Sequence, residues 1–207
     1  MPEILLATHN AGKLRELRQL AAGLRWRSLD EFPHVAPSAE TGRTFADNAR
    51  QKALYYAAAT GLPTLADDSG LEVDALQGAP GVRSARFAGE ARDDRANNRK
   101  LVRLLRDVPP AARTARYRCA VAFALDGRVV AEADGTLEGV ICDEPRGAGG
   151  FGYDPHFLIP ELGLTAAELP AERKNAISHR GQALRKALPR IEELLAARSP
   201  NPASPAE

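Results

Sequence analysis

The sequence has few cysteines, few aromatic residues and almost no net charge. Its 207 residues include 2 cysteines and 5% aromatics, and the formal net charge is +1. This balance excludes a broad basic surface of the kind that binds duplex DNA or an anionic membrane. The scarcity of aromatics also argues against a general RNA-binding domain. A local anion site is still compatible with the total, because a focused pocket barely changes it.

Long apolar runs are also missing. None approaches the roughly 20 residues that a membrane helix needs, and no charged-then-apolar leader opens the chain. Cys119 and Cys142 lie far apart and show no metal-ligand pattern, so two reduced thiols are favoured over a disulfide. We therefore expect a cytoplasmic protein with no membrane and no nucleic-acid partner.

What is present is the composition of a globular domain, with 44% hydrophobic and 27% charged residues. The length fits one large domain, which we place at residues 1–198. Residues 199–207, SPNPASPAE, have the proline-rich composition of a disordered tail.

The hydrophobic patterns indicate an α/β fold. Strands are expected at residues 3–7, 63–66, 115–125, 129–133 and 135–141. Helices are expected at residues 11–22, 44–60, 93–105 and 178–198. Asp126-Gly127 is a hairpin dipeptide between two of the strands, and residues 147–160 are glycine-rich and irregular. Because a hairpin joins antiparallel strands while helices interleave with the others, the sheet should be mixed.

The stretch LATHNAGKLREL, residues 6–17, begins like a phosphate-binding P-loop, since a strand, a glycine-lysine turn and a helix follow in order. The P-loop pattern is G-x-x-x-x-G-K-[ST]. Here Ala7 stands at its first glycine and Leu14 at its hydroxyl position, so a P-loop is excluded. Residues 147–152 spell G-x-G-x-x-G, but neither a strand before them nor a helix after them supports a dinucleotide site.

Thr8, Asn10 and Lys13 remain as candidate anion ligands in that first turn. Backbone N–H groups point outward at a helix N-terminus, and a lysine adds a positive charge. Alternatively, Thr8 or Asn10 only caps the helix and Lys13 is solvated. The segment by itself leaves both interpretations open.

Carboxylates occur in two places expected to be loops. Asp67 and Asp68 lie in ADDSG, at the expected end of a strand, and Glu40 lies in SAETG. Carboxylates in such places bind Mg²⁺ or accept a proton from water. The alternative for ADDSG is a polar turn in which an aspartate caps the loop.

Three further segments carry polar or aromatic groups. Lys52 lies on the same face of its expected helix as several apolar residues. Its side chain either lies over these residues with the charge in solvent or points into a cleft. The loop FGYDP, residues 151–155, holds a ring that stacks on a base or plugs the core. KNAISHR, residues 174–180, clusters donors before the last helix, where they suit a nucleotide or form an exposed helix start.

Each motif alone is weak, but their order is specific. THNAGK, ETGRTFADNARQKA, ADDSGLEVDALQGAPGVRSARFAG, GGFGYDP and ERKNAISHRGQAL together resemble the inosine/xanthosine triphosphate pyrophosphatase family. The match runs from about residue 4 to residue 188. The resemblance implies an elongated two-lobed α/β fold around a long mixed β-sheet, with the active site in the cleft between the lobes. It also implies a homodimer and Mg²⁺-dependent hydrolysis of ITP, dITP or XTP to a monophosphate and pyrophosphate.

Matched by position, the resemblance implies a complete set of site residues. The triphosphate ligands would be Thr8, Asn10, Lys13 and Lys52. The metal carboxylates would be Glu40 and Asp68, with Asp68 and Lys52 also catalytic and Asp68 the proton acceptor. The remaining substrate-binding residues would be Ser69, Phe151 as the stacking ring, Gly152, Tyr153, Asp154, and Lys174, His179 and Arg180 at the purine edge.

Two other functions fit parts of the sequence. A related pyrophosphatase acting on modified pyrimidine or methylated nucleotides is disfavoured by the SHR cluster and the FGYD loop. A non-catalytic nucleotide-binding module would keep the lysines and Phe151, but it would not need the carboxylates Glu40, Asp67 and Asp68.

Overall fold

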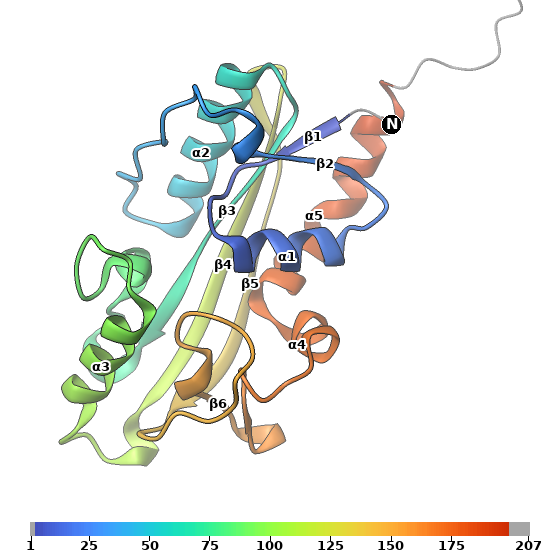
Figure 1. Cartoon of the computed structure of the whole chain (residues 1–207). Coiled ribbons are helices and arrows are strands. Elements are labelled where there is room, and N and C mark those ends of the chain that lie inside the picture. Colours follow the sequence, from blue (N-terminus) through green and yellow to red (C-terminus); the bar gives the residue numbers. More distant parts are fainter. Residues whose placement is uncertain (1–2, 199–207) are drawn as a thin grey trace, which may run out of the picture.

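The computed structural model describes residues 3–198, and the predicted tail at residues 199–207 lies outside them (Figure 1). The strands are β1 (Glu3–Leu6), β2 (Arg25–Ser28), β3 (Thr64–Val73), β4 (Thr114–Leu125), β5 (Arg128–Ile141), β6 (Phe157–Ile159) and β7 (Leu164–Thr165). The α-helices are α1 (Ala11–Leu20), α2 (Phe45–Thr60), α3 (Asp94–Leu105), α4 (Ala171–Ile177) and α5 (His179–Ala196).

The strands form one mixed sheet in the order β2-β1-β3-β4-β5-β6-β7. β1 pairs in parallel with β2 and β3, and the pairings from β3 to β7 are antiparallel. The hairpin of β4 and β5 runs the length of the molecule (Figure 1). Helices α1, α2 and α5 gather at one end of it and α3 with β6 at the other, so the expected elongated two-lobed α/β fold is confirmed.

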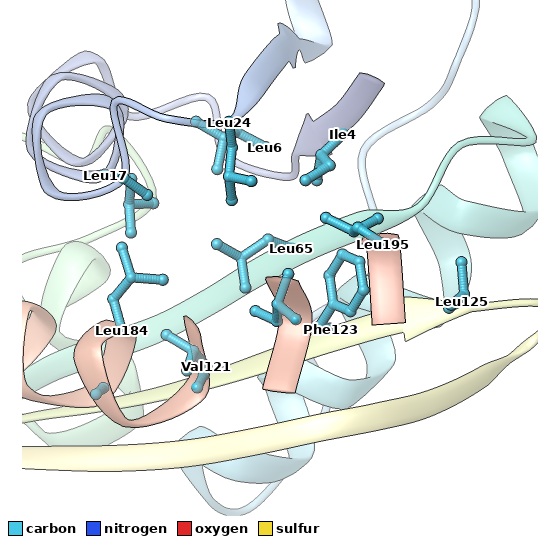
Figure 2. Close-up of a cluster of buried hydrophobic side chains, with 14 of the residues drawn as sticks. Ile4, Leu6, Leu17, Leu24, Leu65, Val121, Phe123, Leu125, Leu184 and Leu195 are labelled. Atoms are coloured by element: carbon cyan, nitrogen blue, oxygen red, sulfur yellow. The ribbon is translucent and has the colours of Figure 1, made fainter. Parts of the chain in front are cut away.

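Strand alternation divides the core between the two faces of the sheet. Ile4 and Leu6 of β1 join Phe123 and the α5 residues Leu184 and Leu195 on one face (Figure 2). The intervening Leu5 joins the cluster beneath α2 on the other face. A third cluster, which includes Leu71, Leu101 and Phe157, forms the core of the lobe that carries α3.

The helix predicted at residues 44–60 is confirmed as α2, and both of its ends are capped. The Thr44 side chain accepts a hydrogen bond from the Asp47 N–H at 3.1 Å, and Gly61 ends α2 in the left-handed conformation. Both cysteines are free thiols, as expected. Within residues 3–198, no helix combines the length and the apolar character required to cross a membrane.

The expected end of the strand at residue 66 is wrong. β3 continues through the acidic residues to Val73, because β4 pairs with it along its whole length. β1 pairs only with Thr64 and Leu65, so no strand within residues 3–198 covers this edge of β3 from Ala66 onward, and an isolated bridge with Pro80 follows at Glu72. Asp67 and Asp68 therefore lie in mid-strand, at the point where the neighbouring strand leaves the sheet.

Three other expectations need correction. Residues 129–133 and 135–141 are one strand, β5, because its pairing with β4 runs past Asp134 with one irregularity at Phe123/Ala124. The irregular segment 147–160 contains β6, which pairs with Val140 and Ile141 of β5. The residues before the last helix form a separate short helix, α4, which carries Lys174 and was not expected.

Candidate active site

Two adjoining cavities lie along the cleft between the lobes. The aromatic pocket is lined by residues that include Tyr117, Phe151, Tyr153, Lys174, His179 and Arg180. The polar pocket is lined by residues that include Thr8, Glu40, Lys52, Asp68, Arg86 and Arg92. Both share the lining residues Asn10, Lys13, Ser69, Ala85 and Asp94. A single elongated ligand could therefore span the two pockets.

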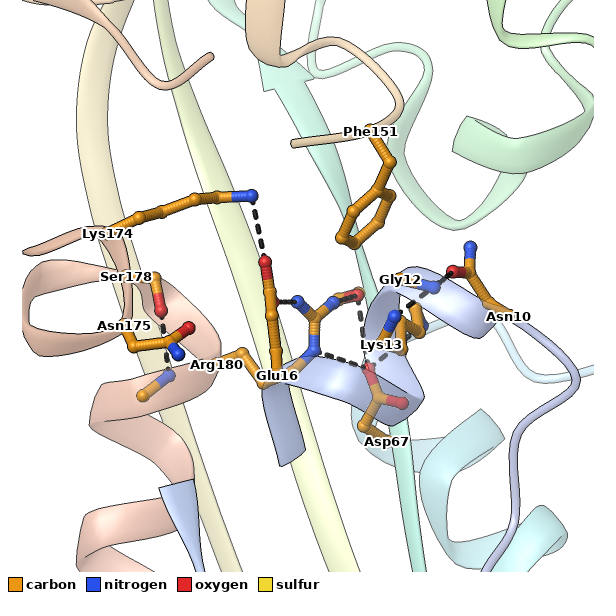
Figure 3. Close-up of polar contacts among 12 residues, drawn as sticks. Asn10, Gly12, Lys13, Glu16, Asp67, Phe151, Lys174, Asn175, Ser178 and Arg180 are labelled. Atoms are coloured by element: carbon orange, nitrogen blue, oxygen red, sulfur yellow. Dashed lines mark hydrogen bonds and ion pairs between the residues drawn. The ribbon is translucent and has the colours of Figure 1, made fainter. Parts of the chain in front are cut away.

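The turn before α1 is built by its own side chains. The Asn10 side chain caps the helix by accepting hydrogen bonds from the N–H groups of Gly12 at 2.8 Å and Lys13 at 3.1 Å. Thr8 Oγ1 accepts from the Asn10 N–H at 3.1 Å. Lys13 is not solvated as the alternative had it, because its Nζ lies 2.8 Å from Asp67 Oδ2 (Figure 3). The turn thus delivers a positive charge to the junction of the pockets.

Strand alternation separates the two adjacent aspartates onto opposite faces of β3. Asp67 is fully buried and forms an ion pair with Lys13. Its Oδ2 also accepts hydrogen bonds from Ser69 Oγ at 3.2 Å and from Arg180 Nε at 3.4 Å. Burial by itself raises the pKa of Asp67, but Lys13 and Arg180 outweigh it and hold the pKa well below its usual range. Asp67 is therefore a fixed negative charge between cations from α1 and α5.

Asp68 faces α2 instead. Its Oδ1 accepts from Lys52 Nζ at 2.9 Å and its Oδ2 from Asn48 Nδ2 at 3.0 Å. Lys52 is buried and points into the cleft, which resolves the two sequence alternatives. Burial lowers the pKa of Lys52, but Asp68 and its neighbours Asp67 and Glu40 raise it above the ordinary lysine value overall.

Glu40 joins the same lysine from a separate loop. Its Oε1 lies 3.3 Å from Lys52 Nζ, and its Oε2 lies 3.6 Å from Arg86 and 4.0 Å from Arg92. Burial raises the pKa of Glu40, whereas Lys52 and Arg92 bring it below the usual value. The polar pocket thus places two carboxylates around one ammonium group.

This pair of carboxylates fits a partial site for Mg²⁺. Glu40 and Asp68 converge on one point, which Lys52 Nζ marks. Among residues 3–198, no group of three or more histidine, cysteine, aspartate or glutamate side chains could enclose a metal ion. Mg²⁺ keeps several waters and is often bound by one or two carboxylates together with substrate phosphates. Two carboxylates of this kind are compatible with a divalent metal that a phosphorylated ligand would help to hold.

A buried ion network forms the floor of the aromatic pocket (Figure 3). Lys174 Nζ lies 2.8 Å from Glu16 Oε1 and 2.6 Å from Asp154 Oδ2. Arg180 donates to Glu16 through Nη1 and to Ser69 Oγ through Nη2 at 2.8 Å. Burial raises the pKa of Glu16, but Arg180 and Lys174 overcome it and lower the pKa below its usual value. Every nitrogen of the buried Arg180 guanidinium is hydrogen-bonded.

Aromatic rings form the walls of this pocket. The Phe151 ring centroid lies 4.8 Å from Lys174 Nζ and 5.7 Å from Arg180 Cζ. The ring also packs on Gly12, where a Cβ would come within 2.5 Å of Phe151 Cδ1. Glycine at that position is therefore required by the close approach of Phe151, which joins the turn before α1 to the aromatic loop.

His179 belongs to the wall as a neutral ring. It stacks on Tyr117 with centroids 4.7 Å apart and an interplanar angle of 18°, and Tyr117 donates its hydroxyl to Asp154 Oδ1 at 3.1 Å. Burial, with Arg180 and Lys174 nearby, pushes the pKa of His179 well below 6.5. Within the described part of the chain, its buried Nδ1 has no hydrogen-bond partner.

The structure brings together all the site residues expected from the sequence, around the two pockets. Sequence reasoning missed Glu16 and Tyr117 and gave Asp67 no separate role. Glu16 had a signal, because it follows Lys13 by three residues and so shares a face of α1. Tyr117 had none, since nothing in β4 shows which α5 residue it will meet.

The sequence model of the Ham1 family matches residues 4–190. A dITP/XTP pyrophosphatase of Desulforamulus reducens is 56% identical over 188 residues, which are 90% of this chain and 94% of that protein. A second dITP/XTP pyrophosphatase, from Geobacter sulfurreducens, is 53% identical over 89% of this chain and 94% of its own length. Among solved structures, a HAM1 protein from Coxiella burnetii superposes with a TM-score of 0.82 at 42% identity, covering 95% of this chain and all of that one.

Proposed function

This chain belongs to the Ham1 family, and on that premise we propose that it hydrolyses non-standard purine nucleoside triphosphates to a monophosphate and pyrophosphate. The substrates would be dITP, ITP and XTP, so the enzyme would remove deaminated purines from the nucleotide pool. The observation that carries the proposal is that the two pockets adjoin and share lining residues. An aromatic pocket with polar donors adjoins a polar pocket with lysines and paired carboxylates, and Lys13 and Ser69 line both.

The triphosphate would lie in the polar pocket. It brings about four negative charges, which Lys13 and Lys52 would bind once they exchange carboxylate partners for phosphate oxygens. Thr8 and Asn10 shape the turn at the α1 N-terminus, where the helix dipole favours an anion. Glu40 and Asp68 would hold Mg²⁺, which supplies charge neutralisation to the phosphate oxygens.

Asp68 would align or deprotonate the attacking water. The water oxygen bonds to the α-phosphorus, the bond to the bridging oxygen of the β-phosphate breaks, and pyrophosphate leaves with that electron pair. Asn48 and Lys52 fix both carboxylate oxygens of Asp68, at 3.0 and 2.9 Å, so the carboxylate direction is set before substrate arrives. These contacts support Asp68 and Lys52 as the catalytic pair, with Asn48 still holding Asp68 after Lys52 turns to a phosphate oxygen.

Base selection would occur in the aromatic pocket. Phe151 would stack on the purine, and Gly152, Tyr153 and Asp154 shape the loop that carries it. Hypoxanthine and xanthine present a keto acceptor at C6, whereas adenine presents an amino donor there. Donors of the group Lys174, His179 and Arg180 would pair with the keto oxygen and oppose the amino group.

A pyrophosphate-release assay with Mg²⁺ tests the proposal. We expect release from dITP and XTP at rates far above those with ATP, and no release when the metal is chelated. Equal rates on dITP, XTP, ATP and GTP would contradict the proposed selectivity. No release from any of them would contradict the proposed activity.

The expected homodimer and cytoplasmic location also belong to this proposal, and the family resemblance supports them. Light scattering coupled to size-exclusion chromatography should give about twice the 22.2 kDa chain mass. A mass of one chain would contradict the homodimer. Fractionation of the source cells should recover the protein with the cytoplasmic enzymes, and recovery elsewhere would contradict the location.

A further inference from the structure

The first turn of α3 holds the backbone of the loop that carries Phe151. Asp94 Oδ2 accepts a hydrogen bond from the Gly152 N–H at 2.8 Å, and Asn98 Nδ2 donates to the Gly152 carbonyl at 2.8 Å. The two side chains are four residues apart and so lie on one face of the helix. Figure 1 shows α3 beside the loop that precedes β6. Helix α3 thus binds both the N–H and the carbonyl of Gly152.

Gly152 is well placed to transmit this contact. It lies between the two rings Phe151 and Tyr153, and its φ of +63° is a conformation that favours glycine. Within the loop, the Phe151 N–H donates to Asp154 at 2.9 Å, and Tyr153 donates its hydroxyl to the carbonyl of Ser84, outside the loop, at 2.7 Å. The α3 contacts therefore tie Gly152, which adjoins Phe151, to a helix of the same lobe.

Asp94 also occupies a particular place in the cleft, because it lines both pockets. A carboxylate beside a triphosphate site repels the ligand unless nearby cations offset its charge. Its oxygen is used here to accept the Gly152 N–H, and Lys13 and Arg92 line the same polar pocket. The hydrogen bond to Gly152 thus gives Asp94 a role in holding the loop that carries Phe151.

We propose that Asp94 and Asn98 are positioning residues that clamp Gly152 and so set the distance between Phe151 and the floor of the aromatic pocket. The inference rests on the proposed function, in which Phe151 stacks on the purine. The clamp determines how well the base is held, because both of its hydrogen bonds go to the residue that follows Phe151. It acts through Gly152 and touches neither the base nor the reacting phosphorus.

The clamp is tested by Asn98→Ala, Asp94→Ala and Asp94→Asn, with Arg95→Ala as the matched control on the exposed part of the same helix turn. Removing a hydrogen bond of this kind is expected to raise KM for dITP about tenfold in Asn98→Ala and Asp94→Ala, with kcat changed less than about threefold. Asp94→Asn keeps an acceptor oxygen and should restore KM to within about threefold of the parent. Arg95→Ala should leave KM unchanged.

Two binding measurements separate positioning from general damage. By calorimetry, IMP should bind about tenfold more weakly to Asn98→Ala, while inorganic pyrophosphate, which has no base, should bind as it does to the parent protein. Equal weakening of both ligands, or of neither, would overturn the clamp. Failure of Asp94→Asn to restore KM would overturn it as well, because charge and not the hydrogen bond would then be the cause.

Hydrogen exchange distinguishes failure of the clamp from failure of the proposed activity. The Gly152 amide should exchange at least tenfold faster in Asp94→Ala than in the parent, and at the parental rate in Arg95→Ala. This readout needs no substrate. Unchanged exchange would overturn the clamp even in an active enzyme, whereas faster exchange in a protein that releases no pyrophosphate would overturn only the proposed reaction.

Discussion

The two pockets use similar charged residues and differ in how those charges are satisfied. In the aromatic pocket, Lys174 and Arg180 are buried and bound by Glu16, Asp154 and Asp67 in a closed network. In the polar pocket, Lys52, Arg86 and Arg92 share Glu40, and Arg92 and Glu40 remain partly exposed. The first pocket is preorganised, since its ions already have their partners. The second must exchange partners when an anion and a metal bind.

This difference predicts that substitutions in the two pockets will change different properties, turnover in one case and stability in the other. Loss of a group in the polar pocket should reduce turnover and leave the fold nearly intact. Loss of a group in the aromatic network should destabilise the protein, because it leaves a buried charge without its partner.

The largest effect is expected for Asp68→Asn. The amide cannot accept the proton of the attacking water, so kcat should fall by about 10²–10⁴-fold, while Lys52 keeps Glu40 as a partner. Pyrophosphate release from dITP measures the loss, and circular dichroism should show an unchanged fold. Near-parental turnover would remove Asp68 from the mechanism.

Glu16→Gln should have the next largest effect, on stability. Lys174 and Arg180 both lose a charged partner in the buried network, and breaking a buried pair costs about 3–5 kcal/mol of unfolding free energy. Urea denaturation measures it. The matched control is Glu193→Gln, whose pair with Arg190 is exposed and should contribute less than about 1 kcal/mol. Equal losses in the two variants would contradict a preorganised floor.

A pH effect should arise from the aromatic pocket. The pKa of His179 lies well below 6.5 in the folded protein, because of burial and then Arg180 and Lys174. The unfolded chain binds this proton below about pH 6.5 and the folded protein does not. The contribution of His179 to the free energy of unfolding is therefore fully present above pH 6.5. Below that pH it falls by up to about 1.4 kcal/mol per pH unit.

His179→Gln removes that contribution and isolates it from the other titrating groups. The slope of unfolding free energy between pH 6.5 and 5 should be smaller in the variant than in the parent. This window lies above the range in which Glu16 and Asp67, whose pKa values are lowered, lose their contribution. Identical slopes would show that His179 takes up a proton in the folded protein.

The smallest effect is expected for Thr44→Ala. This change removes the side-chain cap of α2, which carries Asn48 and Lys52, and should cost about 1 kcal/mol of unfolding free energy. At 25 °C the turnover per folded molecule should be unchanged, since neither pocket loses a group. A large fall in kcat would show that the polar pocket depends on the rigidity of the helix end.

Much of the fold follows from local sequence patterns. Thr44, Asp47 and Gly61 mark the limits of α2 within one residue, because capping and chain reversal depend on near neighbours. Asp126-Gly127 marks the β4–β5 hairpin for the same reason. The short strands β2, β6 and β7 were missed, because two to four residues carry too little pattern.

The sequence by itself determined the α/β class, the caps, the excluded P-loop and the set of polar residues around the cleft. Only the tertiary structure decided that β3 runs on through its acids and that alternation sends Asp67 to Lys13 and Arg180 but Asp68 to Lys52. It also decided that Glu16, far from Lys174 and Arg180 in the chain, lies between them. Ion pairs of this range depend on how strands and helices pack, and packing is a property of the whole chain.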